Sequence, residues 1–224
     1  MEYLVFIMLS LVAVSVVVAV GGVTGVFNTG EKLKLYRKID GVKPYSNVYL
    51  ILTIIVCFAL ALVLQISLYK NTSVINYIKL FTTFVIVFSA AAVDLKRKII
   101  PNFLVLSGLV IRIGLYIYEI ASKQEMKEVL ISDLIGFAIG FLFLGLISFV
   151  TKGMIGFGDA KLFAVIGLMS GSFCTYSTLL LSLVVSLLVS IIGLILKKLK
   201  KKDSFPFGPC IAAGYTLAIL LVSY

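Results

Sequence analysis

The sequence contains no histidine, and only 13% of its 224 residues are charged. The absence of histidine excludes Ser–His and Cys–His catalysis and any metal site with a histidine ligand. The three cysteines lie far apart and form no Cys-x-x-Cys pair, so we expect neither a zinc site nor a disulfide framework. Because a soluble domain usually carries about 25% charged residues, the low charge content also excludes an ordinary soluble enzyme.

Long apolar runs make up most of the chain, which is 61% hydrophobic. A helix needs about 20 apolar residues to cross the hydrocarbon core of a bilayer. We therefore predict an all-α membrane protein, a polytopic bundle of eight membrane-spanning helices, with six or seven as the alternative counts. The predicted spans cover residues 4–27, 48–69, 77–93, 103–121, 132–151, 160–172, 174–196 and 208–224. The sixth run is the shortest, and merging with its neighbour is one way to accommodate it.

The net charge is +10, and the basic residues lie between the apolar runs rather than in one patch. Fifteen Lys and Arg residues fall in segments 28–47, 94–102, 152–161 and 197–207, whereas four fall in the connections expected on the opposite side. Basic loops remain in the cytoplasm. The bias predicts a multi-pass protein of the cell (plasma or inner) membrane with both termini outside. We expect contact with membrane lipid and none with nucleic acid.

Asp94 and Asp159 are the two carboxylates expected at the cytoplasmic ends of helices, at a similar depth. Charges at membrane depth are costly and therefore mark functional candidates. Two close carboxylates share one proton, and such a pair catalyses peptide hydrolysis without a metal or a nucleophilic side chain. Gly156 and Gly158 precede Asp159, and glycine allows unusual dihedrals and close approach of a second chain. The alternative is structural, because Asp159 at a helix start can simply cap that helix.

Three stretches resemble the prepilin peptidase family of GxGD intramembrane aspartic peptidases, peptidase family A24. Residues 94–102 (DLKRKIIPN) resemble the segment around the first catalytic aspartate, and residues 156–162 (GFGDAKL) resemble the GxGDxKL segment. Residues 205–209 (FPFGP), followed by Ala212, Ala213 and Gly214, resemble the entry to the last helix. The resemblance implies that Asp94 and Asp159 are catalytic, with Gly156, Gly158, Lys161, Pro101 and Asn102 as motif-supporting residues.

The resemblance further implies an aspartic endopeptidase that cleaves the basic leader from type 4 prepilin-like precursors (pilins, pseudopilins or archaellins) at the cytoplasmic face. The substrate class carries a basic leader and a hydrophobic helix. We expect residues 77–224 to form the catalytic membrane domain and residues 1–76 a helical pair with a short basic cytoplasmic loop. Many bacterial members have a larger N-terminal domain with two CxxC pairs and also N-methylate their product. The loop 28–47 has no cysteine, so we predict cleavage without methyl transfer and no cofactor.

One alternative from another class is a transporter or channel in which Asp94 and Asp159 form a proton or cation site. Such proteins favour carboxylates near the midplane and inverted repeats, and no repeat is visible in this sequence. Of the other charges in the apolar runs, Arg112 is expected to snorkel or to pair with Glu119, seven residues on along the same helix face. Asp133 is expected to cap a helix.

Overall fold

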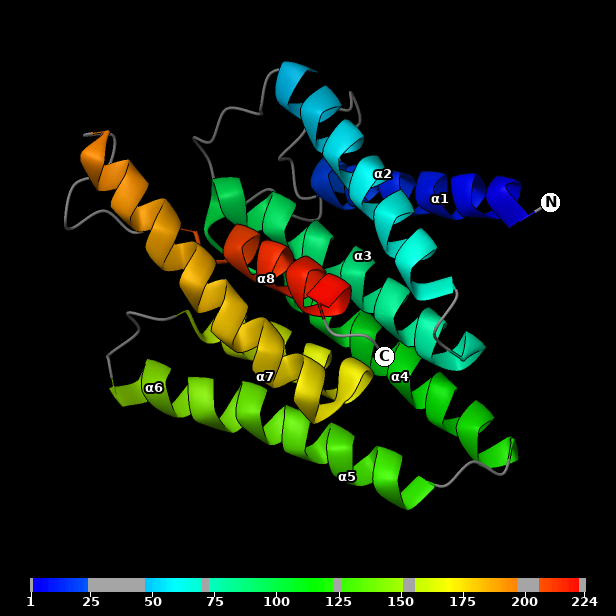
Figure 1. Cartoon of the computed structure of the whole chain (residues 1–224). Helices are drawn as coiled ribbons and strands as arrows, with labels where there is room; N and C mark the ends of the chain where they lie inside the picture. The colour runs from blue at the N-terminus through cyan, green and yellow to red at the C-terminus, as the bar shows by residue number, and fades with distance from the viewer. Residues whose placement is uncertain are drawn as a thin grey trace.

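The computed structural model describes residues 2–23, 47–69, 73–122, 126–150, 156–196 and 206–221. In these residues every regular element is a helix (Figure 1), which confirms the predicted all-α fold. The elements are α1 (Glu2–Val23), α2 (Asn47–Tyr69), α3 (Val74–Arg97), α4 (Asn102–Ala121), α5 (Met126–Phe137), the π-helix η2 (Ala138–Phe143), α6 (Leu144–Val150), α7 (Phe157–Ile195) and α8 (Gly208–Leu221).

Four helical segments of the described chain are long and apolar enough to cross a bilayer: α3, α4, the continuous run Met126–Val150 and α7. Three shorter apolar helices accompany them, at Leu9–Val20, Ile51–Val63 and Gly208–Leu221. The chain is therefore a membrane protein, and the count of eight spans remains a prediction. The expected sixth and seventh spans both fall within α7.

α7 consists of two helical halves that meet at Gly171. This residue has φ 76° and ψ 179°, a conformation that essentially only glycine adopts. The side chain of Ser186, in the second half, is hydrogen-bonded to Cys210. Cys210 also interacts electrostatically with Asp94. Asp159, in the first half, also interacts with Asp94. On a straight helix Asp159 and Ser186 would lie about 40 Å apart, so the chain must reverse at Gly171. Figure 1 shows this turn at the yellow end of the long yellow-to-orange part of α7.

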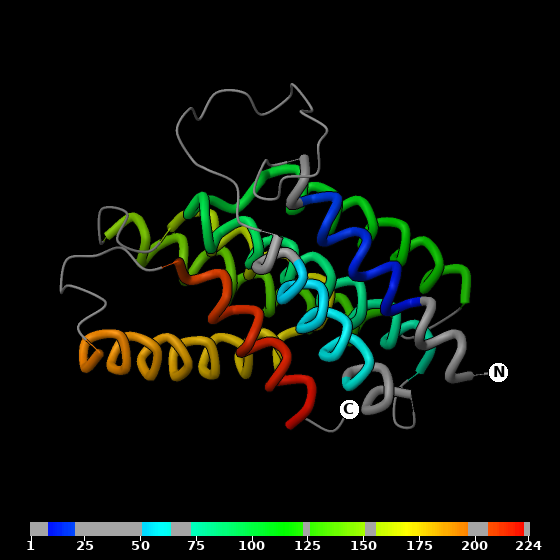
Figure 2. The backbone as a smooth tube through the Cα atoms, turned by 90° about the horizontal axis from the view of Figure 1, so that it is seen from above, coloured from blue at the N-terminus to red at the C-terminus, as the bar shows by residue number. Residues whose placement is uncertain are grey.

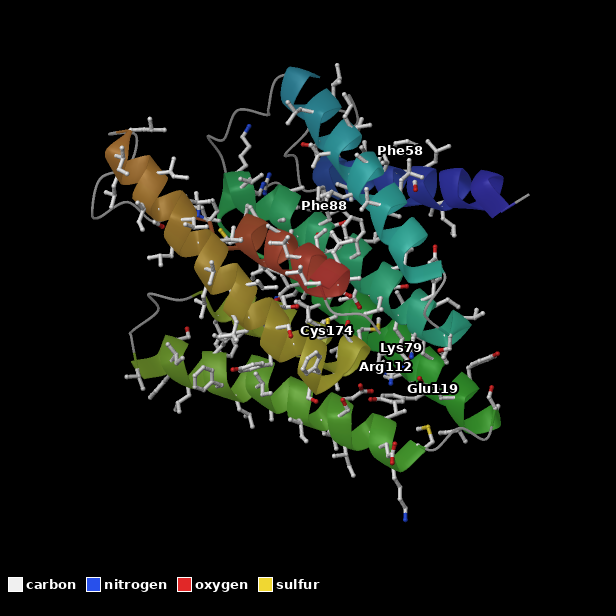
Figure 3. The ribbon with its side chains drawn as sticks, in the orientation of Figure 1. Phe58, Lys79, Phe88, Arg112, Glu119 and Cys174 are labelled. Carbon is white, nitrogen blue, oxygen red and sulfur yellow. The ribbon has the colours of Figure 1, made fainter. Side chains whose placement is uncertain are left out.

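α3 packs against α1, α2, α4, α7 and α8. Its core-facing side chains include Phe84 and Val87, each 1% exposed, and Phe88 lies on the same helix (Figure 3). Small residues, Ala90 to Ala92, occupy the turn before Asp94 and are buried. Helices α1 and α2 pack on each other and on α3, and Figure 2 shows the two (blue and cyan) together on one flank of the bundle. α3 therefore carries Asp94 into the centre of the packed helices.

The first half of α7 packs closely against α5 and η2. A Cβ added to Gly136 would lie 2.8 Å from the carbonyl oxygen of Gly167, and one on Gly140 would lie 2.5 Å from that of Phe163. Because Gly136 faces Gly167 while Gly140 faces Phe163, the two segments run antiparallel. This backbone contact, at a π-helical turn of the kind often found at functional sites, fixes the helix whose first turn carries Asp159.

Candidate active site

Asp94 lies in the last turn of α3 and is 5% exposed. The helix ends at Lys98, which adopts left-handed dihedrals (φ 52°, ψ 35°) and donates its N–H to the carbonyl oxygen of Asp94 at 2.9 Å. Pro101 then precedes α4 as its N-cap and is buried. A left-handed residue followed closely by proline is a common way to end a helix. The sequence after Asp94 therefore turns the chain directly into α4.

Asp159 lies in the first turn of α7 and is 8% exposed. Its backbone N–H donates to the carbonyl oxygen of Gly156 at 3.0 Å, and its carboxylate accepts a hydrogen bond from the Gly156 N–H. The carboxylate thus caps its own helix, at the end where the helix dipole favours negative charge. The capping role left open by the sequence is present, and it does not exclude catalysis, because the same side chain also faces Asp94.

The two aspartates come together at the junction of α3 and α7. They are separated by 65 positions in the sequence, both are buried, and the carboxyl group of Asp159 lies within the electrostatic influence of Asp94. Two carboxyl groups at such proximity do not readily carry two negative charges, and sharing a single proton relieves the repulsion. An arrangement of this kind can offer one proton donor and one proton acceptor.

The third motif segment, residues 205–209, also contacts Asp94. The backbone N–H of Gly208, the first residue of α8, donates to Asp94 Oδ2 at 2.7 Å. A Cβ on Gly208 would lie 2.8 Å from Asp94 Cβ. The sequence placed Gly208 in a motif but gave it no role in the site, since 114 residues separate it from Asp94. The contact results from the packing of α8 beside α3 and could not be predicted from the sequence.

The predicted motif-supporting residues join the two aspartate segments. Lys161 Nζ donates to Asn102 Oδ1 at 3.1 Å, which links the start of α7 to the start of α4. Gly158 is helical, and a Cβ there would lie 3.2 Å from Ile100 Cβ. The reason for glycine at this position is therefore the close approach of the neighbouring loop, and an unusual dihedral angle is not required. With Gly156 and Pro101 at the two helix starts, all three motif segments meet at Asp94 and Asp159.

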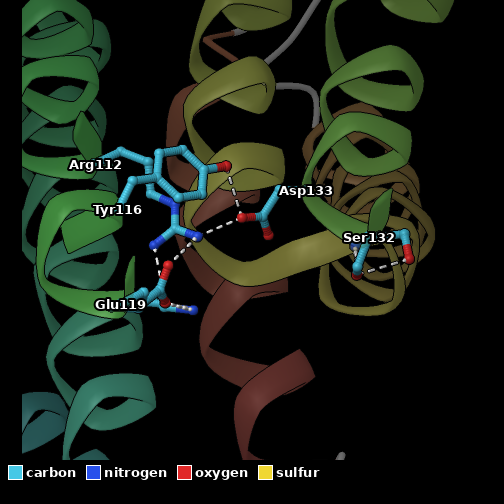
Figure 4. A network of polar contacts seen from close by, with 7 residues as sticks. Arg112, Tyr116, Glu119, Ser132 and Asp133 are labelled. Atoms are coloured by element: carbon cyan, nitrogen blue, oxygen red, sulfur yellow. Dashed lines mark hydrogen bonds and ion pairs between the residues drawn. The ribbon is translucent and has the colours of Figure 1, made fainter. Parts of the chain in front are cut away.

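A second cluster of buried charges lies at the other end of α3 (Figures 3 and 4). Lys79 pairs with Glu119 at 2.6 Å, Arg112 pairs with both Glu119 and Asp133, and the Tyr116 hydroxyl donates to Asp133 at 2.8 Å. The prediction that Arg112 pairs with Glu119 is confirmed. The expectation that Asp133 caps a helix is wrong, because α5 begins seven residues earlier, at Met126.

This second cluster also revises the placement of Lys79, which was counted among the four basic residues on the side opposite the cytoplasm although it falls within the expected span 77–93. Lys79 lies inside α3 and is 7% exposed, because α3 begins at Val74. A cavity of about 270 Å³ opens beside the cluster and is lined by both Lys79 and Asp133. Fifteen residues of helix separate Lys79 from Asp94, which corresponds to about 22 Å. The charge cluster is therefore distinct from the aspartate pair.

Comparison with known proteins agrees with this geometry. The chain is 34% identical over 133 residues to a Bacillus subtilis protein named "Prepilin leader peptidase/N-methyltransferase", covering 58% of this chain and 50% of that one. It is 30% identical over 129 residues to a Stutzerimonas stutzeri protein of the same name, covering 57% and 44%. The chain thus matches about half the length of these curated relatives, and no solved structure matches it. The model of the type IV leader peptidase family matches residues 80–196. This range includes Asp94, Asp159 and every residue of the charge cluster except Lys79. The chain therefore belongs to that family.

Proposed function

We propose that this protein is an aspartic endopeptidase that removes the basic leader from type 4 prepilin-like precursors. The observation that carries the proposal is the convergence of three separate motif segments on two buried carboxylates, Asp94 and Asp159. Membership of the type IV leader peptidase family and the names of the relatives support the same activity. The substrate is a protein with a basic leader followed by a hydrophobic helix.

The chemistry follows from the shared proton. The ionised carboxylate of the pair takes a proton from a water molecule, whose oxygen attacks the scissile carbonyl carbon. The protonated carboxyl group donates its proton to the carbonyl oxygen, which gives a tetrahedral diol. When the C–N bond breaks, the first group returns its proton to the leaving nitrogen, and the second regains a proton from the diol. The pair ends with one proton, as it began.

The surrounding residues hold the pair in place. The Lys161–Asn102 hydrogen bond and the contact of Gly158 with Ile100 tie the two aspartate segments together. Pro101 and Gly156 start the two helices that follow the loops. We assign the catalytic part of the chain to residues 77–224 and the N-terminal helical pair to residues 1–76. The family match at residues 80–196 supports this division.

We place the aspartates at the cytoplasmic face of the cell membrane. Lys96, Arg97 and Lys98 follow Asp94 within four residues, and Lys161 follows Asp159 by two positions. Basic residues at helix ends favour the cytoplasmic side. A prepilin-like leader is cytosolic in this arrangement, so its cleavage site reaches the pair without crossing the membrane.

The transporter alternative has less support. It expects carboxylates near the middle of a span, whereas Asp94 lies in the last turn of α3 and Asp159 in the first turn of α7. The charges deeper in the bundle, such as Arg112 and Asp133, pair with each other. A network that neutralises itself is suited to holding helices together.

The proposal is tested with purified protein in lipid vesicles and a precursor that carries a basic leader and a hydrophobic helix. Mass spectrometry should detect a shortened product, and N-terminal sequencing should place the cut before the hydrophobic helix. A precursor with an acidic leader serves as the control. Proton or cation flux without any shortened product would favour the transporter instead.

The same assay tests the absence of methyl transfer. The loop 28–47, on which that expectation depends, lies almost entirely outside the described residues. With S-adenosylmethionine added, we expect the new N-terminal amine to keep its unmodified mass. A gain of one methyl group in the presence of this protein alone would contradict the expectation and leave the peptidase proposal intact.

A further inference from the structure

The start of α8 touches Asp94 through its backbone. Gly208 N–H lies 2.7 Å from Asp94 Oδ2, and both residues are buried. Pro209 has no N–H, so Gly208 supplies the only donor of the first two residues of α8. An N–H that points from a helix start to a carboxylate makes a short, charge-assisted hydrogen bond. The contact therefore acts on the orientation of the Asp94 carboxyl group.

No side chain fits at position 208 in this arrangement. A Cβ added there would lie 2.8 Å from Asp94 Cβ, 2.9 Å from Oδ2 and 3.2 Å from Cγ. The Asp94 Cβ is fixed to the backbone of α3, so a change of side-chain rotamer does not relieve the overlap. Any residue other than glycine must move either α8 or the aspartate.

α8 itself is held in place further along its length. The hydroxyl of Tyr215, which is 0% exposed, donates to the carbonyl oxygen of Leu80 at 3.0 Å and lies 3.1 Å from Ser170 Oγ. A Cβ on Gly214 would lie 2.6 Å from the backbone nitrogen of Ser182. These contacts attach α8 to both α3 and α7, the two helices that carry the aspartates. The position of the Gly208 N–H relative to Asp94 is therefore set by the packing of the same three helices.

We propose that Gly208 is a positioning residue, whose backbone N–H holds the Asp94 carboxyl group in the orientation that faces Asp159. This inference rests on the proposed peptidase function. The N–H holds Oδ2, and on this proposal Oδ1 is the oxygen that faces the partner carboxyl group. Proton transfer between a carboxyl group and a reacting atom depends on such orientation, and a misplacement of about 1 Å costs about 100-fold in rate.

The test compares Gly208→Ala with Gly114→Ala, whose added Cβ has no atom within 4 Å. Both are measured in vesicles for kcat, KM and thermal midpoint. We expect Gly208→Ala to lower kcat about 100-fold while KM stays within about twofold, because the substrate-binding surface is unchanged. Gly114→Ala should match the wild type in all three quantities.

A second variant separates the hydrogen bond from the added methyl group and serves if Gly208→Ala does not fold. Replacing the Gly208 backbone amide by an ester removes the N–H and adds no atom. Because a hydrogen bond to a charged group is lost, kcat should fall about 10-fold or more.

An ester variant with wild-type kcat overturns the inference and leaves the peptidase function standing. A rise in KM at constant kcat also overturns it, since the N–H would then bind substrate. If the wild type and Gly114→Ala both fail to cleave, the proposed function is wrong and the inference fails with it.

Discussion

Lys161 Nζ lies 3.1 Å from Asn102 Oδ1, and this hydrogen bond joins two residues that are 59 positions apart in the sequence. Lys161 follows Asp159 by two positions, and Asn102 follows Pro101 at the start of α4. The bond therefore connects the start of α4, which follows the loop after Asp94, with the start of α7, which carries Asp159. It is exposed, so its net contribution is about 1 kcal/mol.

A double-mutant cycle measures this connection. Lys161→Met removes the ammonium group and keeps the apolar stem, and Asn102→Ala removes the acceptor. Each single change should lower the cleavage rate about fivefold, equivalent to about 1 kcal/mol. The double variant should be no slower than either single variant, because the two changes remove the same bond. Losses that add up independently would show that the two side chains act separately.

Replacing either aspartate by asparagine should abolish leader cleavage. Asp94→Asn and Asp159→Asn keep the shape of the side chain but remove a proton acceptor or donor, and general acid–base catalysis contributes about 100- to 10,000-fold. We expect kcat to fall by that range in each variant, measured on precursor in vesicles, while the protein still inserts in the membrane.

Glu128→Gln is the matched control for these two variants. It makes the same acid-to-amide change at an exposed carboxylate of α5 and should cleave like the wild type. A near wild-type rate in Asp94→Asn or in Asp159→Asn would remove that residue from the catalytic pair.

The buried charge cluster should contribute to stability rather than to chemistry. Arg112→Met removes the side chain that pairs with both Glu119 and Asp133. Lys79 still pairs with Glu119, whereas Asp133 loses its ion pair with Arg112 and keeps the hydrogen bond from the hydroxyl of Tyr116. An uncompensated buried charge costs about 3–5 kcal/mol.

We therefore expect the free energy of unfolding of Arg112→Met to fall by about 3–5 kcal/mol, measured by denaturant titration in detergent micelles. Lys127→Met removes an exposed cation from α5 and should change the same quantity by no more than about 0.5 kcal/mol. Cleavage by the folded fraction of Arg112→Met should persist at low temperature. Equal stability of the two variants would mean that the cluster is dispensable.

The sequence was sufficient to predict the helices that consist of long apolar runs. It predicted the first and last residues of those helices less well. The expected boundary between residues 172 and 174 falls close to the reversal at Gly171. The expected cap at Asp133 was wrong, because α5 begins at Met126, about two turns before the apolar run 132–151. Those first turns contain charged residues, so the apolar run does not include them. Composition therefore locates the apolar interior of a helix better than its polar first turn.

The pairing of Arg112 with Glu119 could be predicted because both lie on one face of a single helix. The third partner, Asp133, comes from another helix, and no local pattern predicts that contact. The bond from Gly208 to Asp94 has the same character, since it depends on how α8 packs beside α3. Contacts within one helix follow from spacing, whereas contacts between helices follow from packing that one sequence does not specify.

The orientation in the membrane can be tested at the two ends of the helices that flank the site. Lys98, which follows α3, is exposed, and α4 begins four residues later and ends at Ala121. α4 has 20 residues, enough for about 30 Å, which is the thickness of the hydrocarbon core. Lys127, close to the start of α5, is therefore expected on the opposite face from Lys98.

Lys98→Cys and Lys127→Cys form a matched pair for labelling with a membrane-impermeant thiol reagent. Cys57, Cys174 and Cys210 are buried, so they should give little background. Fifteen Lys and Arg residues lie on the expected cytoplasmic side, and with Lys79 placed inside α3 only three, Lys70, Lys123 and Lys127, are expected on the opposite side. Because basic segments stay in the cytoplasm, Lys98→Cys should react only after the cells are permeabilised. Lys127→Cys should react in intact cells. Labelling of Lys98→Cys in intact cells would reverse the orientation and place both aspartates on the face away from a cytosolic leader.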